Sequence, residues 1–299
     1  MELAELVKQY RSEPRRTWNF ASSSHWYDGD DFWLDMITND PIYRGAMIET
    51  EAQMIAKICA SVAGERQQGI FVALGPGDGV KELQLREALG TPLYVPIDIN
   101  KTELALAAKT ATGAVRPIHA EFRDGLSKVK DEHPKFIYLG STYSNLDAFE
   151  YDLLAVIDNS LKPGDAFYVS VQTCPEHKDL ALILSQYENL HYTQLTERLT
   201  GQAGITIGKE FSQFNPVTSN LEVAASVATV SGAAEEVGVK PGDTVVTMIS
   251  HKPQALKTEL AIRFGERYDI RTYQTQHVVD VRGMQYTSHF EGAILTKKA

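Results

Sequence analysis

A glycine-rich turn and a later aspartate are the residues whose types and spacing first indicate ligand chemistry. Gly75, Gly77 and Gly79 directly follow a short apolar run, and Asp98 closes the next apolar run. Glycines permit positive φ and let a ligand approach the backbone and the N-terminus of the following helix. A carboxylate after the second strand can accept hydrogen bonds from both hydroxyls of a ribose. The unit predicts a site for an adenosine-type ligand, although its spacing also permits a dinucleotide or a tight turn with a satisfied surface aspartate.

A second polar stretch, residues 139–145, follows a later apolar run and reads Leu-Gly-Ser-Thr-Tyr-Ser-Asn. In open α/β sheets, ligands bind outside the carboxyl ends of strands where the strand order reverses. This loop would therefore face both a cofactor and a substrate. The amide of Asn145 offers a donor and an acceptor, which suits the carboxylate or amine of an amino acid. It could equally cap the helix that follows.

The elements that must position these loops are short apolar runs alternating with segments of helical periodicity. We expect strands over 70–74, 93–97, 115–119, 136–140 and 166–171, and helices over 44–63, 80–89, 101–110 and 149–161. This alternation predicts a doubly wound, parallel α/β sheet.

The flanking segments predict three further parts. Residues 1–66, rich in aromatic side chains, are interpreted as an N-terminal helical cap. Residues 191–250 contain two β-prone runs with no clear helix between them, which predicts a smaller antiparallel lobe inserted on the substrate side. The main domain would then comprise 67–190 and 251–299. Its end is expected to hold a helix over 253–267 and a hairpin of strands over 269–277 and 290–297.

Composition narrows the partners. The 299-residue chain carries a formal net charge of −10, which disfavours nucleic-acid phosphates and anionic membranes, so we expect a small-molecule substrate. Cys59 and Cys174 lie outside any Cys-x-x-Cys pair and the histidines are scattered, so no metal site is expected. The sequence shows neither the apolar core of a signal peptide nor a run long enough to span a membrane, which predicts a cytoplasmic location. The oligomeric state stays open.

Four stretches carry a resemblance to a known family. Residues 74–81 match Leu-Gly-Ser-Gly-x-x-x-Lys, residues 94–98 match Tyr-x-Pro-x-Asp, and residues 139–145 match Leu-Gly-Ser-Thr-x-x-Asn. Residues 27–32 match Tyr-Asp-x-x-Gly-Ser-x-Leu-Phe imperfectly. In this order they resemble the L-histidine Nα-methyltransferase family, which forms hercynine on the way to ergothioneine. The resemblance implies a class I, Rossmann-like methyltransferase that uses S-adenosylmethionine.

The resemblance also implies roles for individual residues. Asp98 would bind the ribose, and Glu121 and Phe122 would flank the adenine. The whole cofactor set is Gly75, Gly77, Gly79, Lys81, Asp98, Glu121, Phe122, Gly140 and Ser141. Tyr27 would orient the amine, and Asn145 would hold the substrate carboxylate together with Tyr187. The whole substrate set is Tyr43, Asn145, Tyr187, Glu222, Met248 and Ser250.

Departures from the family pattern concern the acceptor. Met248 stands where the family places an acid that grips the imidazole, although Ser250 is kept. The paired tyrosines after the early proline are reduced to Tyr43. A polar group in a pocket rejects a substrate that lacks the matching hydrogen-bond partner. The absence of the acid therefore predicts a methyl acceptor other than histidine. We expect another amino acid, or an amine with a more apolar side chain. Glu222 could supply an acid from the neighbouring lobe, or could be a surface acid on an alternating strand.

Other activities compete with methyl transfer. The same cofactor supports aminocarboxypropyl transfer, which the sequence barely separates from methylation. A nicotinamide-dependent oxidoreductase would use the acid after the second strand, but the Leu-Gly-Ser-Thr loop does not fit it. A module that binds the cofactor without turnover is the remaining alternative.

Overall fold

The computed structural model describes residues 8–11, 17–19, 32–63, 69–130, 133–145, 153–173, 182, 186, 222–229, 244–251 and 253–299.

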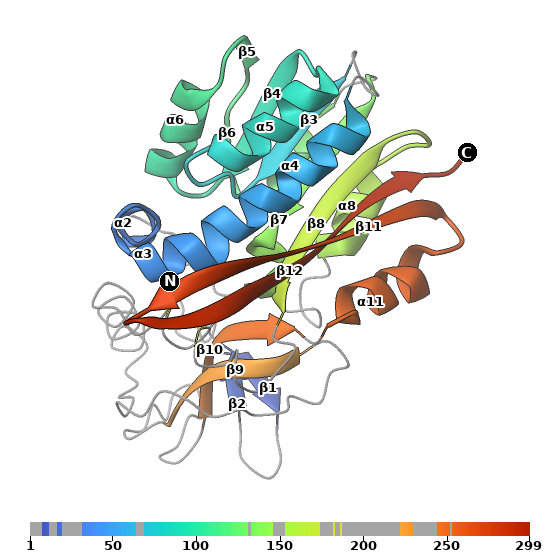
Figure 1. Ribbon diagram of the computed structural model, residues 1–299. Helices are drawn as coiled ribbons and strands as arrows, with labels where there is room; N and C mark the ends of the chain where they lie inside the picture. The colour runs from blue at the N-terminus through green and yellow to red at the C-terminus, as the bar shows by residue number, and fades with distance from the viewer. Residues whose placement is uncertain are drawn as a thin grey trace.

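A parallel sheet whose strand order reverses forms the centre of the fold (Figure 1). The strands are β3 (Ile70–Leu74), β4 (Leu93–Asp98), β7 (Lys135–Gly140) and β8 (Ala166–Thr173). The chain passes from β3 outward to β4, then returns to β7 on the other side of β3 and continues to β8. The order reverses between β3 and β7, which is where an open sheet of this kind binds its ligand. The predicted doubly wound sheet is therefore confirmed.

The strand predicted over 115–119 is wrong in detail. The structure has two short strands, β5 (Ala114–Val115) and β6 (Ile118–His119), which both pair parallel with β4. Pro117 lies between them and has no N–H to donate to a ladder, which explains the interruption.

A long antiparallel hairpin closes the sheet on the side of β8. It consists of β11 (Tyr268–Val281) and β12 (Met284–Lys297), and β12 pairs antiparallel with β8. We predicted the hairpin but made both strands too short. The turn consists of Arg282 and Gly283, both at positive φ (56° and 83°), which is the backbone that tight hairpins require.

Helices cover both faces of the sheet. On one face, α4 (Thr50–Val62) and α5 (Val80–Leu89) pack against each other. Beneath them lies a row of rings whose neighbouring centroids are 5.2–6.2 Å apart. The row comprises Tyr94, Phe71, Phe136, Tyr138 and Tyr168.

The opposite face is aliphatic. There α7 (Phe122–Lys128), α8 (Leu153–Ser160) and α11 (Ala255–Phe264) share one buried cluster with alternate residues of the strands. α6 (Lys101–Thr110) follows β4 and is capped by Asn100, whose side chain accepts from the N–H groups of Thr102 and Glu103. The helices predicted in the main domain thus form, with ends shifted by a few residues.

The N-terminal part departs from the predicted helical cap. It contains two strands, β1 (Lys8–Arg11) and β2 (Thr17–Asn19), and the helix α2 (Phe32–Asn39). β2 pairs parallel with β10 (Thr244–His251), so an available strand edge outweighs local helix preference there.

The helix predicted over 44–63 is present but not uniform. α3 (Pro41–Tyr43) leads into a π-helical segment, η2 (Arg44–Glu49), before α4 begins. The hydroxyl of Thr50 donates to the carbonyl of Gly45, five residues earlier, at 2.9 Å. A Cβ on Gly45 would lie 3.3 Å from Val279 of β11, so the segment packs closely on the hairpin.

β9 (Glu222–Thr229) and β10 pair antiparallel, as expected for the two β-prone runs. β10 meets β8 where His251 pairs with Thr173. The boundaries of the inserted lobe stay a prediction. Within the described part of the chain, no helix has the length and hydropathy needed to cross a membrane.

Candidate active site

The glycine turn between β3 and α5 has the backbone that its sequence predicts. Gly75, Gly77 and Gly79 have φ of 64°, 58° and 80°. The N–H of Gly75 donates to the carbonyl of Ile97 at 3.0 Å, which joins the turn to β4. Glycine adopts this left-handed backbone without strain and has no Cβ. A ligand can therefore approach the turn and the N-terminus of α5 closely.

Three of the predicted loops meet at Gly75. A Cβ added there would lie 3.1 Å from the hydroxyl of Thr142 and 3.4 Å from the ring of Phe122. A Cβ added at Gly77 would lie 4.0 Å from Cδ1 of Ile37 in α2. The glycine turn, the start of α7 and the loop after β7 are thus brought together at the switch point of the sheet.

Asp98 ends β4 beside this turn and is 4% exposed. The N–H of Asn100 donates to its Oδ1 at 2.8 Å, which fixes the carboxylate. Burial raises the pKa of Asp98 to about 6, although hydrogen bonds from the backbone of Asn100 and Ile99 oppose the shift. A buried carboxylate with acceptor capacity left over matches the ribose-binding role expected of it.

Glu51 is a site residue that the sequence reasoning missed. It is 0% exposed and accepts hydrogen bonds from Lys81 Nζ at 2.5 Å, Ser170 Oγ at 2.5 Å and Ser141 Oγ at 3.2 Å. The sequence held a signal for it, because Glu51 precedes the buried Met54 by three residues and therefore lies on the apolar stripe of α4. An acid on such a stripe needs partners, and here two of them are predicted cofactor residues.

A second buried acid lies behind the turn. Glu82 of α5 accepts a hydrogen bond from the hydroxyl of Tyr94 at 2.7 Å. Burial raises the pKa of Glu82 to about 7, and the bond from Tyr94 works against that shift. This hydrogen bond joins α5 to β4 and so helps to fix the start of α5, which directly follows the glycine turn.

The predicted acceptor residues are only partly placed. Tyr27 and Tyr187 lie outside the described residues. Asn145 ends the 3₁₀ segment η3 (Ser141–Asn145). Met248 and Ser250 lie on β10, in register with Ser226 and Ala224 of β9, and Glu222 pairs with His251. Tyr43 is 2% exposed, and its N–H donates to Asp40 Oδ1 at 2.7 Å.

His251, the last residue of β10, contacts the loop after β7. Its ring stacks on Tyr143, with centroids 6.4 Å apart and an interplanar angle of 13°. It is 5% exposed. The structure therefore gives His251 a buried position beside the loop after β7. Among the described residues, no group of three or more His, Cys, Asp or Glu side chains could hold a metal ion.

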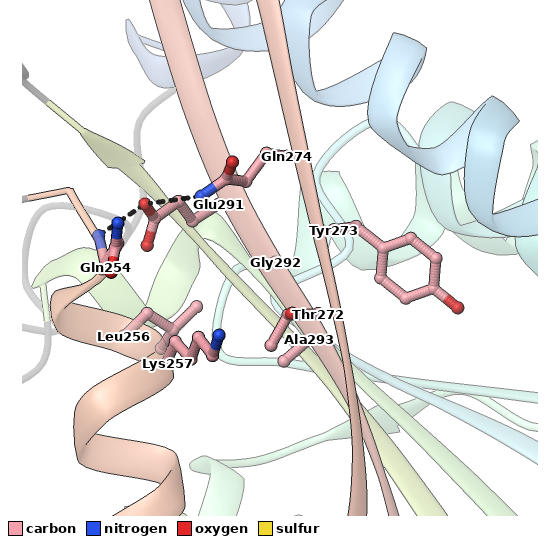
Figure 2. A pocket seen from close by; sticks show the side chains of 9 residues that line it. All are labelled: Gln254, Leu256, Lys257, Thr272, Tyr273, Gln274, Glu291, Gly292 and Ala293. Carbon is pink, nitrogen blue, oxygen red and sulfur yellow. Dashed lines mark hydrogen bonds between the residues drawn. The ribbon is translucent and has the colours of Figure 1, made fainter.

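A pocket of about 320 Å³ lies elsewhere, between the start of α11 and the β11–β12 hairpin (Figure 2). Glu291 accepts there from the N–H of Gln254 at 2.6 Å and from Gln274 Nε2 at 3.2 Å. Tyr273 points away from it, and its hydroxyl bonds that of Ser61 at 3.0 Å. None of the predicted site residues lines this pocket, so we assign it no part in the chemistry.

Comparisons with known proteins agree with this geometry. A profile of the histidine-specific, S-adenosylmethionine-dependent methyltransferases matches residues 15–263. No curated protein matches the sequence significantly. The plantazolicin methyltransferase BpumL, solved in complex with S-adenosylhomocysteine, superposes with a TM-score of 0.51 and 10% identity, over 92% of this chain and 93% of that chain. These similarities to solved structures show the fold.

Two further solved structures align with lower scores. The N-methyltransferase NodS from Bradyrhizobium japonicum WM9 gives a TM-score of 0.45 and 10% identity over 92% of this chain and 96% of that one. The 1,6-didemethyltoxoflavin-N1-methyltransferase from Burkholderia thailandensis gives 0.46 and 12% identity, over 98% and 95% of the two chains.

The reversed strand order, the left-handed turn and the buried acid at the end of β4 are features of a Rossmann-like fold. The family profile identifies the chain as an S-adenosylmethionine-dependent methyltransferase. The chain belongs to the histidine-specific, S-adenosylmethionine-dependent methyltransferase family. The predicted cofactor and enzyme class are confirmed, and the nicotinamide alternative is set aside.

The raised pKa of Asp98 predicts a pH dependence of cofactor binding. Below pH 6 the unliganded protein holds Asp98 protonated, and a neutral carboxyl accepts ribose hydroxyls less well. We expect the affinity for S-adenosylmethionine to be constant above about pH 7 and to fall about tenfold per unit well below pH 6. Calorimetric titration from pH 5 to 8 measures this. An affinity that does not change through pH 6 would show that the ionised carboxylate has no role.

Proposed function

We propose that this protein transfers a methyl group from S-adenosylmethionine to the amine of an amino acid or related small metabolite other than histidine. The observation that carries the proposal is Met248, on β10, at the position where the resembling family has the acid that grips the imidazole. A thioether is only a weak hydrogen-bond acceptor and carries no charge, so it is a poor substitute for a carboxylate opposite an imidazole N–H, whereas it packs well against an apolar side chain. A cytoplasmic location belongs to the same proposal. Partners other than nucleic acid or membranes are also proposed, and the formal net charge of −10 supports this.

The cofactor half of the site is proposed to use the loops that meet at Gly75. The turn of Gly75, Gly77 and Gly79 would lie against the cofactor, Asp98 would accept its ribose hydroxyls, and Phe122 would cover the adenine. Adding a Cβ at Gly75 would fill the space beside Phe122 and Thr142, which supports a ligand that approaches the backbone closely.

The acceptor half needs mainly positioning. When bound, S-adenosylmethionine supplies an activated methyl carbon on a sulfonium, so neither a metal nor a covalent nucleophile is required. Asn145 and Tyr187 are proposed to hold the acceptor carboxylate, and Tyr27 to orient the amine as the neutral base that can attack. Transfer would form a nitrogen–carbon bond as the sulfur–carbon bond breaks, and the methylated amine would lose its proton to solvent or to a nearby group.

The acceptor is tested by mass spectrometry of S-adenosylmethionine incubated with the protein and a panel of amino acids and amines. We expect an amino acid with an apolar side chain to gain one or more methyl masses, with S-adenosylhomocysteine as co-product. Methylthioadenosine as co-product would instead mean aminocarboxypropyl transfer.

Restoring the acid should restore the preference for imidazole. We expect Met248→Glu to raise kcat/KM for histidine relative to the apolar acceptor by about ten- to a hundredfold, because a hydrogen bond to a charged group contributes about 1.5–3 kcal/mol. Met248→Gln is the matched control, since it has the same shape without the charge. If histidine is already the best substrate of the unaltered protein, the proposal from Met248 is wrong.

A further inference from the structure

We infer that Glu51 is a positioning residue that fixes the cofactor-turn helix and the loop after β7 relative to each other. This inference rests on the proposed assignment of those loops to the cofactor and acceptor. It concerns a residue of α4, an element to which the sequence reasoning gave no part in the site.

The carboxylate of Glu51 is shared among separate elements. Its Oε2 pairs with Lys81 of α5 at 2.5 Å and accepts from Ser141 of η3 at 3.2 Å. Its Oε1 accepts from Ser170 of β8 at 2.5 Å, and the hydroxyl of Tyr138 lies at 3.5 Å. Ser170 and Tyr138 hold the carboxylate on the sheet. Lys81 and Ser141 connect it to α5, after the glycine turn, and to the loop after β7.

Those two donors adjoin the residues that meet at the site. Lys81 comes two residues after Gly79, the last glycine of the turn. Ser141 directly precedes Thr142, whose hydroxyl lies 3.1 Å from the Cβ position of Gly75. One carboxylate oxygen therefore sets the spacing of the two backbone segments between which the cofactor is proposed to lie.

Burial makes this connection strong. The Glu51 side chain is 1% exposed and that of Lys81 is 15% exposed, so water competes little for either group. Charge-assisted hydrogen bonds are shorter and stronger than neutral ones. Removing the charge would release α5 and the loop together while leaving the apolar packing of α4 in place.

A second buried acid supplies a matched control. Asp158 of α8 accepts from the hydroxyl of Tyr268 at 2.6 Å and from Lys297 Nζ at 3.0 Å, and it pairs with Arg267. Lys297 also pairs through its N–H with the carbonyl of Asp165, just before β8 begins. Asp158 is therefore a buried acid near the start of β8, whereas the glycine turn follows the end of β3. The two lie at opposite ends of the parallel strands.

The experiment compares Glu51→Gln with Asp158→Asn by calorimetric titration with S-adenosylmethionine and by thermal unfolding. We expect both variants to lower Tm. Only Glu51→Gln should raise the Kd for the cofactor, by about ten- to a hundredfold, the range for losing a hydrogen bond to a charged group. An unchanged Kd in Glu51→Gln, or an equal rise in both variants, would overturn the inference and leave the proposed function standing.

Two further outcomes are informative. If Glu51→Gln does not fold, Glu51→Asp keeps the charge on a shorter stem and is expected to bind several-fold more weakly than the unaltered protein. Equal affinity in Glu51→Asp would then overturn the positioning role. Absence of binding by the unaltered protein would overturn the cofactor site itself, which is a different result from normal binding by the variants.

Discussion

Replacing Asp98 with asparagine is expected to weaken S-adenosylmethionine binding by about a hundredfold or more. The amide keeps one acceptor oxygen for the N–H of Asn100, which lies 2.8 Å from Oδ1. It places an NH₂ donor where the second oxygen would accept a ribose hydroxyl. Hydrogen bonds to charged groups contribute about 1.5–3 kcal/mol each, so weakening two of them gives an effect of this size.

The fold should tolerate the same substitution. The pKa of Asp98 is about 6 in the folded protein against an ordinary value of 3.8, so its ionisation destabilises the unliganded fold. This cost grows as pH rises from about 4 to about 6 and is constant above that. Asp98→Asn should therefore leave Tm at pH 7.5 equal or higher, and should abolish the pH dependence of binding around pH 6. A hundredfold loss of affinity accompanied by a lower Tm would point to misfolding instead.

Replacing Gly79 with alanine is expected to lower the free energy of unfolding by about 2–4 kcal/mol. Gly79 has φ of 80°, and an added Cβ would lie 3.0 Å from the Cα and 3.3 Å from the Cβ of Ala107 in α6. The clash is with a helix backbone that cannot yield cheaply. Because Gly79 is also the N-cap of α5, the cofactor turn should be displaced with it.

Gly164→Ala separates the cost of the left-handed backbone from the cost of the clash with α6. Gly164 has a similar φ of 87°, but an added Cβ meets no described atom within 4 Å. Only the left-handed backbone is penalised there, at about 1–2 kcal/mol. Urea denaturation of both variants measures the difference, which is the packing cost of Gly79 against α6. Equal losses would mean that α6 moves aside freely.

The central sheet could be predicted because its strands are buried on both faces. Such strands are continuous apolar runs, and β3 and β4 are bounded by a glycine turn and by an acid that end them clearly. The hairpin was harder, because Arg282 adopts a positive φ that a local pattern does not predict for arginine. β2 pairs with β1, which is near it in the sequence, and with β10, which lies more than two hundred residues away. The second pairing could not be found from the residues of β2 alone.

In the candidate site, too, local signals could be predicted from the sequence and long-range contacts could not. Glycines and an acid next to strand ends are local signals, and the structure brings Gly75, Phe122 and Thr142 together as the motifs implied. Glu51 was missed because its importance depends on donors from α5, β8 and η3, which only the folded chain assembles. The acceptor residues depend on segments that carry no regular periodicity, and their roles stay predictions.

The junction of β10 with β8 has a consequence for how such an enzyme could diversify. In the described part of the chain these strands pair at one position, His251 with Thr173. In contrast, β12 pairs along β8 from His289 with Thr173 to Thr296 with Ala166. Substitutions along β10 therefore disturb few bonds of the central sheet. Under the positioning role inferred for Glu51, the proposed cofactor half would tolerate change only when several residues change together. Selection for a new acceptor could act on the lobe while the methyl-donor machinery is inherited intact.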